Sequence, residues 1–237
     1  MSNTKKKNPS ADASSSTTRE PQYQECLDAV AERGFERMGL RSSQSWHDDP
    51  KHLLFRLSRY KFVAKMLSGA DKVLEIGCGD AFGTRLVQQE VKSLEATDFD
   101  PVFVEDVQSR MVDRWRFRVF VHDLLDGPIP GSYDGVYALD VLEHIKQQHE
   151  NTFLANTFAP LTRNGVAIIG MPTIESQIYA SPTSKAGHVN CKSMPDLKRL
   201  MQVFFHNVFM FSMNDEVVHT GYHKMAHYVI AVGCSRK

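Results

Sequence analysis

The stretch DVLEH, residues 140 to 144, contains three side chains that can bind a metal ion or move a proton. In a helical turn, Asp140, Glu143 and His144 lie on one face, because they are spaced by three and four residues. His188, in the sequence GHVN, is a candidate fourth ligand. A divalent cation such as Mg²⁺ held there can orient two neighbouring hydroxyls and lower the pKa of one of them. The alternative is that Asp140 caps a helix and Glu143 complements its dipole.

The same histidines can act without a metal ion. His144 is the first candidate for a general base, because imidazole titrates near neutral pH, and His188 is the second. Cys78 has the chemistry of a nucleophile, but it lies inside a glycine-rich loop, which is typical of ligand binding. The sequence therefore leaves two interpretations of these histidines open, metal ligand or base.

The glycine-rich loop is VLEIGCGDAFG, residues 73 to 83, in which a buried strand leads into glycines. Gly77 and Gly79 follow that strand, and ligands of open parallel sheets bind beyond the carboxyl ends of the strands. Glycine lets a ligand approach the main chain without meeting a Cβ atom. Phe82 stands where the dinucleotide pattern GxGxxG requires its third glycine, which argues against a nicotinamide dinucleotide.

Two later strands end in acids that suit a nucleoside. Asp98, in ATDFD, can accept hydrogen bonds from both ribose hydroxyls, and Phe99 can cover one face of an adenine ring. Asp123, in VHDLLD, can accept a hydrogen bond from an adenine amino group, with Leu124 packed on the base and His122 beside it. A ribose-binding acid is shared by several nucleoside cofactors, so the acid near the adenine discriminates better between them.

These residues need an alternating set of strands and helices to position them. Strands are expected at residues 73–76, 94–98, 117–121, 133–139, 166–171, 208–212 and 227–232. Helices are expected at residues 23–38, 50–67, 81–91, 102–111, 148–161 and 194–205. The alternation predicts an α/β fold, a doubly wound, mostly parallel seven-stranded sheet with an antiparallel last strand and helices on both faces. The last two strands have no helix between them, so we expect them to pair antiparallel.

Composition and local pattern suggest three segments. Residues 1 to 20 are polar and low in complexity, which predicts a disordered tail. Residues 21 to 237 are expected to form one domain with helices at its start, because this length suffices for a single α/β core. The long irregular stretch at about residues 172 to 192 predicts a lid or binding loop.

Four motifs in order, EIGCG, ATD, HDLLD and YDGVYALDVLEHI, resemble those of class I S-adenosylmethionine-dependent methyltransferases, over roughly residues 50 to 235. The chain is most similar to the quinone O-methyltransferase-like and bacterial sugar-modifying branches. The quinone-type relatives are metal-assisted and have Glu-x-x-Glu-His where this chain begins with Asp140. Ala81 stands where the family usually has a third glycine.

The resemblance implies a placement for S-adenosyl-L-methionine along the sheet edge. The residues expected around the methionine portion and the ribose are Glu75, Gly77, Cys78, Gly79, Asp98, Leu139 and Asp140. Asp123 and Leu124 are expected at the adenine. Arg59, which forms an RY pair with Tyr60, is expected to reach the methionine carboxylate, a role that suits a bidentate guanidinium.

The resemblance also implies an enzyme that methylates a small-molecule acceptor. The RY pair favours O-methylation of a sugar or nucleotide-linked sugar. Metal-assisted O-methylation of a phenolic or quinone-like acceptor, and N-methylation, are the alternatives. An NAD-linked oxidoreductase and a non-catalytic cofactor-binding subunit are the alternatives of another class.

Charge and cysteine content bear on partners and location. The chain has 28 basic and 28 acidic residues, so it has no general attraction to nucleic acid or to an anionic membrane. No apolar run approaches membrane-spanning length. The four cysteines are far apart, as expected for free thiols in a reducing compartment. We expect a cytoplasmic protein that binds neither nucleic acid nor membrane, and the sequence leaves a homodimer open.

Overall fold

A computed structural model describes residues 17–237, so most of the tail predicted at residues 1 to 20 lies outside the described residues. By its contacts the chain divides after Arg37 into two units. The described part of the first unit contains a 3₁₀ turn, η1 (Pro21–Tyr23), and helix α1 (Gln24–Arg33). The second unit, Met38–Lys237, contains the sheet. The single domain expected from residue 21 onward stays a prediction.

The second unit is built on a sheet that has eight strands within the described residues, in the order β3-β2-β1-β4-β5-β8-β6-β7. Strands β1 to β5 are parallel, and β8 lies antiparallel between β5 and β6. The strands are β1 (Lys72–Ile76), β2 (Ser93–Asp98), β3 (Arg118–Val121), β4 (Tyr133–Leu139), β5 (Leu161–Pro172), β6 (Phe205–Asn214), β7 (Val217–His219) and β8 (Tyr228–Arg236). The predicted fold class is confirmed, including the antiparallel pairing of the last two predicted strands.

The predicted number of seven strands is wrong by one. The additional strand is β7, which pairs antiparallel with β6. It lies in a segment that the sequence presents as a connection, because three residues are too few to show a period of two. The strand forms through its pairing partner and not through its own pattern.

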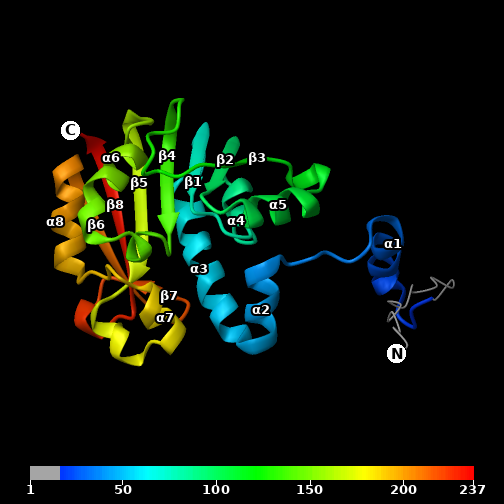
Figure 1. The fold of residues 1–237 in the computed structure, drawn as a ribbon. Coiled ribbons are helices and arrows are strands. Elements are labelled where there is room, and N and C mark those ends of the chain that lie inside the picture. Colours follow the sequence, from blue (N-terminus) through cyan, green and yellow to red (C-terminus); the bar gives the residue numbers. More distant parts are fainter. Residues whose placement is uncertain (1–16) are drawn as a thin grey trace, which may run out of the picture. The chain divides into compact units, whose positions relative to one another are not determined.

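Helices cover both faces of the sheet (Figure 1). They are α2 (Leu40–Asp48), α3 (Pro50–Met66), α4 (Thr84–Gln88), α5 (Pro101–Arg110), α6 (Glu150–Phe158), α7 (Pro182–Gly187) and α8 (Met194–Phe204). Side chains of α6 and α8 pack with one face of the central strands, and side chains of α3, α4 and α5 pack with the other. Alternation along each strand divides its residues between these two cores: in β4, Val136 and Ala138 face one, and Tyr137 and Leu139 face the other.

The carboxyl ends of the parallel strands meet at one edge of the sheet, and α2 and α7 lie beyond that edge (Figure 1). The irregular segment predicted at residues 172–192 contains a 3₁₀ turn, η5 (Glu175–Tyr179), and α7, whose first turn is capped by Ser181. Its two ends are joined by the bond from the Ile174 N–H to the Lys192 carbonyl, 3.0 Å. This loop therefore leaves and returns at the edge where the predicted ligand residues lie. No helix within residues 17–237 combines the length and apolarity needed to cross a membrane.

Candidate active site

A cavity of ≈ 500 Å³ opens at the carboxyl edge of β1, β2 and β4. Nine residues predicted for a cofactor or for catalysis line it: Gly77, Gly79, Asp98, Phe99, His122, Asp123, Leu124, Asp140 and His144. Four separate chain segments thus bring their predicted side chains to one cavity. The position agrees with the rule that ligands of parallel sheets bind beyond the strand ends.

The glycine-rich loop turns sharply below this cavity. Gly77 has φ 69° and Gly79 has φ 53°, in the left-handed region that glycine enters without strain. The N–H groups of Gly77 and Cys78 both donate to the Thr97 carbonyl, at 2.8 and 3.0 Å. A Cβ atom on Gly77 would come within 2.4 Å of the Val141 side chain, so the residue must lack one. Ala81, at the position of the family's third glycine, also has a left-handed φ of 50°.

Asp98 connects this loop to β2. Its carboxylate accepts hydrogen bonds from the Gly79 N–H at 2.8 Å and from the Asp100 N–H at 3.0 Å. The residue is only 6% exposed, yet it lines the cavity. Each carboxylate oxygen can accept more than one hydrogen bond, so capacity remains for a ligand's hydroxyls.

The far end of the cavity is more apolar. Phe99 is 70% exposed, which leaves a ring face open toward a ligand, whereas Leu124 is buried. The His122 Nε2 atom donates to the Gly127 carbonyl at 2.9 Å, and Asp123 accepts from the Leu125 N–H at 2.8 Å. These bonds hold the loop after β3 so that an apolar floor and an acid lie together, a combination that suits an adenine.

Glu75 differs from its predicted place. Its side chain lies in the core beside the helices and does not line the cavity. It accepts hydrogen bonds from Tyr60 at 2.9 Å, Thr84 at 2.6 Å and Tyr137 at 2.7 Å. Burial raises the pKa of Glu75 to about 7, although the three hydroxyl donors act in the opposite direction. The side chain therefore joins α3, α4 and β4 under the glycine-rich loop.

The Glu75 pKa predicts a specific dependence of stability on pH. Between about pH 4.5 and about pH 7 the folded state keeps a proton that the unfolded chain has lost, so the free energy of unfolding decreases as pH rises through this range, by about 3 kcal/mol from this group. Glu75→Gln should flatten this part of the profile, because glutamine does not titrate. Urea unfolding at about pH 5 and about pH 8 checks it, with the exposed Glu105→Gln as matched control. An unchanged slope in Glu75→Gln contradicts the assignment.

Arg59 also differs from its predicted place. Its Nη1 atom donates to both carboxylate oxygens of Asp140, at 2.8 and 2.7 Å, and its guanidinium lies 3.8 Å from the centre of the Tyr228 ring. Both side chains of the ion pair are largely buried. Burial is the largest influence on the pKa of Asp140 and would raise it, but the charges of Arg59, Arg41 and Arg56 and the Tyr228 hydroxyl together hold the pKa below its ordinary value. Asp140 itself has φ 59°, an unusual backbone conformation that the ion pair helps to fix.

The predicted four-ligand metal site is reduced to three residues. Asp140 is engaged by Arg59, whereas Glu143, His144 and His188 bring donor atoms within 4.8 Å of one another. The segment after β4 forms a single 3₁₀ turn, η3 (Leu142–His144), in place of the expected helix start. Glu143 is fully buried, and neither of its carboxylate oxygens has a hydrogen-bond partner within the described residues. Burial, and then the Asp140 charge, raise its pKa well above the ordinary value.

The rings of His144 and His188 pack edge to face, with centroids 5.3 Å apart and an interplanar angle of 65°. His144 Nδ1 lies 2.9 Å from the Gly187 carbonyl, which can only accept, so Nδ1 carries the proton of the neutral ring. His188 Nδ1 lies 2.9 Å from the Gln177 side-chain oxygen, with the same consequence. Both Nε2 atoms are therefore the basic ones, able to accept a proton or to bind a metal. Burial, and then the His144 charge, lower the pKa of His188.

Two other predicted residues lie in the core. Cys78 and Leu139 are nearly fully buried and belong to the cluster under α3, α4 and α5. Burial raises the pKa of the Cys78 thiol far above its ordinary value, which makes this thiol a poor nucleophile.

Arg41 is the main cavity residue that the sequence analysis missed. It lies on α2 and lines the cavity beside Asp140. Its charge affects Asp140, Glu143 and His188, which places it at the end of the cavity where these residues lie. Within residues 17–237 its side chain makes no ion pair. The α2 segment is polar and shows no helical apolar period, so the sequence carried no signal for it.

The fold and the position of this cavity are typical of enzymes that bind a nucleoside cofactor, and comparisons with known proteins indicate which class of enzyme this is. Residues 73–165 match the model of a methyltransferase domain family. A protein of Mycolicibacterium smegmatis and one of Mycobacterium tuberculosis, each named as a probable S-adenosylmethionine-dependent methyltransferase, are 30% identical over 114 residues. The match covers 48% of this chain and 42% and 39% of theirs. The chain thus matches about two fifths of the length of these curated relatives.

Solved structures share the fold at lower identity. The N-methyltransferase NodS of Bradyrhizobium japonicum WM9, bound to S-adenosyl-L-homocysteine, superposes with TM-score 0.60 and 16% identity, over 80% of this chain and 90% of NodS. A chain from the complex between the Haloferax volcanii Trm112 methyltransferase activator and a putative methyltransferase gives TM-score 0.65 and 14% identity, over 89% and 97%. The prediction of a methyltransferase is confirmed: residues 73–165 match a methyltransferase domain family, and the chain has the fold of these solved structures.

Proposed function

We propose that this protein transfers a methyl group from S-adenosyl-L-methionine to an oxygen of a small hydroxylated acceptor, a sugar or nucleotide-linked sugar. The observation that carries the proposal is the cavity that joins the glycine-rich loop, Asp98 and Asp123 to His144. Nucleoside-binding groups at one end and a basic nitrogen at the other are what such a transfer requires.

The residues present fit the cofactor. Asp98 would accept from the ribose hydroxyls, and Phe99, Asp123 and Leu124 would hold the adenine. When bound, S-adenosyl-L-methionine supplies a methyl group on a positively charged sulfur. The turn from Asp140 to His144 lies at the end opposite the adenine, so it faces the reacting atoms in this arrangement.

Arg41 takes the role that the sequence assigned to Arg59. The Arg59 charge is neutralised by Asp140 at 2.7 Å, whereas Arg41 lines the cavity and faces the same end. A carboxylate is the natural partner of a guanidinium that has no anion of its own. We therefore assign the methionine carboxylate to Arg41.

His144 acts as the general base in this proposal. Its Nε2 accepts the proton of the acceptor hydroxyl as the oxygen takes the methyl carbon and the carbon–sulfur bond electrons remain on sulfur. The Gly187 carbonyl fixes the tautomer that this role needs. Orientation of the hydroxyl and exclusion of water supply the rest of the rate enhancement.

One observation favours a second candidate, metal-assisted O-methylation of a phenolic or quinone-like acceptor. Glu143, His144 and His188 offer one carboxylate and two imidazole nitrogens, and both Glu143 oxygens lack partners within the described residues. A Mg²⁺ or similar divalent cation there would lower the pKa of a bound hydroxyl. Activity that is lost on treatment with a chelator and recovered on adding the cation distinguishes this candidate from catalysis by a metal-free base.

Calorimetry with two ligands tests the cofactor assignment. S-adenosyl-L-homocysteine contains the amino-acid portion, and 5′-methylthioadenosine lacks it. Asp98→Ala should weaken both by about 1–3 kcal/mol, because both contain the ribose. Arg41→Ala should weaken only S-adenosyl-L-homocysteine, by a similar amount, because only that ligand has a carboxylate.

The controls separate the two assignments from the proposal itself. Asp126→Ala, an exposed acid outside the cavity, should bind both ligands like the wild type. Equal losses for both ligands in Arg41→Ala contradict the carboxylate assignment alone. Failure of the wild-type protein to bind either ligand refutes the proposed function.

A further inference from the structure

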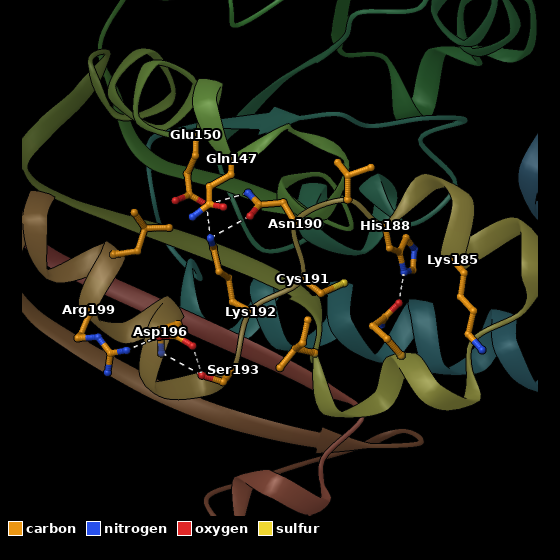
Figure 2. Close-up of a pocket in the computed structure, with 14 residues that line it drawn as sticks. Gln147, Glu150, Lys185, His188, Asn190, Cys191, Lys192, Ser193, Asp196 and Arg199 are labelled. Atoms are coloured by element: carbon orange, nitrogen blue, oxygen red, sulfur yellow. Dashed lines mark hydrogen bonds and ion pairs between the residues drawn. The ribbon is translucent and has the colours of Figure 1, made fainter.

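A second, larger cavity of ≈ 790 Å³ lies between the loop at residues 174–193 and the start of α8. Figure 2 shows its lining, in which polar side chains of the loop, of α6 and of α8 point toward one another. Its volume is within the range of about 300–1,000 Å³ that small-molecule sites occupy. No residue of the cofactor proposal lines it.

The two cavities lie on either side of the histidine pair. His188 lines the second cavity, His144 lines the first, and their rings are 5.3 Å apart. A molecule in the second cavity can therefore present one hydroxyl to the His144 Nε2 atom while its remainder stays outside the cofactor cavity. A molecule bound in this way would be placed as the acceptor of the methyl group.

Four of the five charged side chains that line the second cavity form ion pairs with one another; the fifth, a lysine, donates a hydrogen bond to a backbone carbonyl. Lys192 contacts Glu150 at 2.7 Å and donates to the Asn190 side-chain oxygen at 2.9 Å. Asn190 in turn donates to Glu150 at 2.8 Å, which closes a triangle of three largely buried side chains (Figure 2). Arg199 pairs with Asp196 at the rim. The site therefore offers hydrogen-bonding groups of both kinds with little net charge.

This pairing disfavours an anionic group. A phosphate needs unpaired cations or bare N–H groups at a helix start. The start of α8 instead has its capping Ser193, which accepts from the Asp196 N–H, and the carboxylate of Asp196 in the first turn. Lys185, the remaining lysine of the lining, donates to the Ile178 carbonyl at 3.1 Å.

Neutral hydroxyls fit the same lining well. A hydroxyl donates and accepts at once, so it can bridge a carboxylate and an amide or ammonium group without disturbing their charge balance. Gln147 adds an exposed amide at the wall, and Ile174, Val189 and Leu200 add apolar surface for carbon-bound hydrogens. A sugar ring presents both hydroxyls and C–H groups on its surface, which match the polar and apolar parts of this lining.

We propose that the second cavity binds the sugar portion of a neutral, phosphate-free glycoside acceptor, with the methylated hydroxyl directed at the histidine pair. This inference rests on the proposed function and narrows it, because it favours a glycoside over a nucleotide-linked sugar. The recognising groups are the Glu150–Asn190–Lys192 triangle and Gln147.

Ligand-observed NMR with defined probes tests the inference, in protein saturated with S-adenosyl-L-homocysteine. The probes are methyl α-D-glucopyranoside, methyl β-D-galactopyranoside and methyl α-L-rhamnopyranoside, compared with UDP-glucose and catechol. At least one glycoside is expected to bind with an affinity on the order of millimolar. Gln147→Ala should weaken it about fivefold, for one lost hydrogen bond, and Gln147→Trp roughly tenfold or more, by filling the cavity.

Gln148 provides the matched control. It is an exposed neighbour of Gln147 but lies outside the cavity, so Gln148→Ala and Gln148→Trp should bind the glycoside like the wild type. Equal effects at the two positions, or binding of only UDP-glucose or only catechol, overturn the inference. The inference is also overturned if the protein binds S-adenosyl-L-homocysteine but none of the glycosides. If the wild-type protein does not bind S-adenosyl-L-homocysteine, the proposed function itself has failed.

Discussion

His144→Ala is expected to lower the turnover number by about 10²–10⁴-fold, the usual contribution of a positioned general base. The affinity for S-adenosyl-L-homocysteine should change by less than about twofold, because the proposed cofactor contacts are made by the glycine-rich loop, Asp98 and Arg41 and not by His144. The measurement is methyl transfer from radiolabelled S-adenosyl-L-methionine to the acceptor that the wild-type protein methylates, together with calorimetry. A parallel fall of turnover and cofactor affinity contradicts the role as a base.

His149→Ala supplies the matched control, because this exposed histidine lies five positions further on and outside both cavities. A chelator then separates the two roles that His144 can have. If its Nε2 is a base, the wild-type protein keeps its turnover in EDTA. If its Nε2 holds a cation with Glu143 and His188, EDTA removes the activity and Mg²⁺ restores it.

The fold was predictable because the parallel strands are short, buried and apolar and each is followed by a distinct end signal. Strand β4, Tyr133–Leu139, has the predicted bounds, and β1 extends the predicted strand by one residue. Strand β7 and helix α2 were not predicted, because each is stabilised by what it packs against and not by its own pattern. The sequence therefore predicted the strands and helices that have an apolar pattern of their own. It missed these two elements, which are stabilised by contacts with neighbouring elements.

The candidate site likewise contains residues whose positions the sequence predicts and residues whose positions depend on tertiary contacts. Gly77, Gly79, Asp98 and Asp123 lie at or just beyond the carboxyl ends of parallel strands, so topology alone brings them to one cavity. The sequence could not show that the Glu75 side chain lies in the core and not at the cavity, because its three hydrogen-bond donors come from three distant elements.

The two arginines show the same limit. An arginine's partner is fixed by tertiary structure, so the sequence could not show that Arg59 is occupied by Asp140 while Arg41 faces the cavity. Charged side chains are long, and several acids lie within reach of each. Motif position therefore predicts a carboxylate or a backbone turn better than it predicts the reach of a guanidinium.

Arg59→Met is expected to lower the free energy of unfolding by about 3–5 kcal/mol near pH 7, because it removes the ion-pair partner of the buried Asp140 carboxylate. Arg116→Met breaks an ion pair between two exposed side chains, Arg116 and Asp113, and should cost about 0–1 kcal/mol. The two variants remove the same side chain, so their difference reports the environment of the pair. Urea unfolding monitored by circular dichroism measures both.

The double variant Arg59→Met/Asp140→Asn tests the cause of that loss. Asparagine tolerates the left-handed φ of 59° and has no charge, so the double variant should recover part of the stability that Arg59→Met loses.

The pH dependence of the stability difference between Arg59→Met and the wild type tests the same cause independently. In the wild type Asp140 contributes stability above its ordinary pKa of 3.8 that is lost as pH falls through its lowered folded value. Arg59→Met removes the largest of the influences that lower the pKa of Asp140, so the folded pKa rises and the stability that Asp140 contributes at neutral pH decreases. The deficit of Arg59→Met relative to the wild type should therefore shrink toward acidic pH and be largest at neutral pH. A deficit that does not vary with pH, or a double variant no more stable than Arg59→Met, would show that Arg59 stabilises the fold through packing on Tyr228 and not through the charge of Asp140.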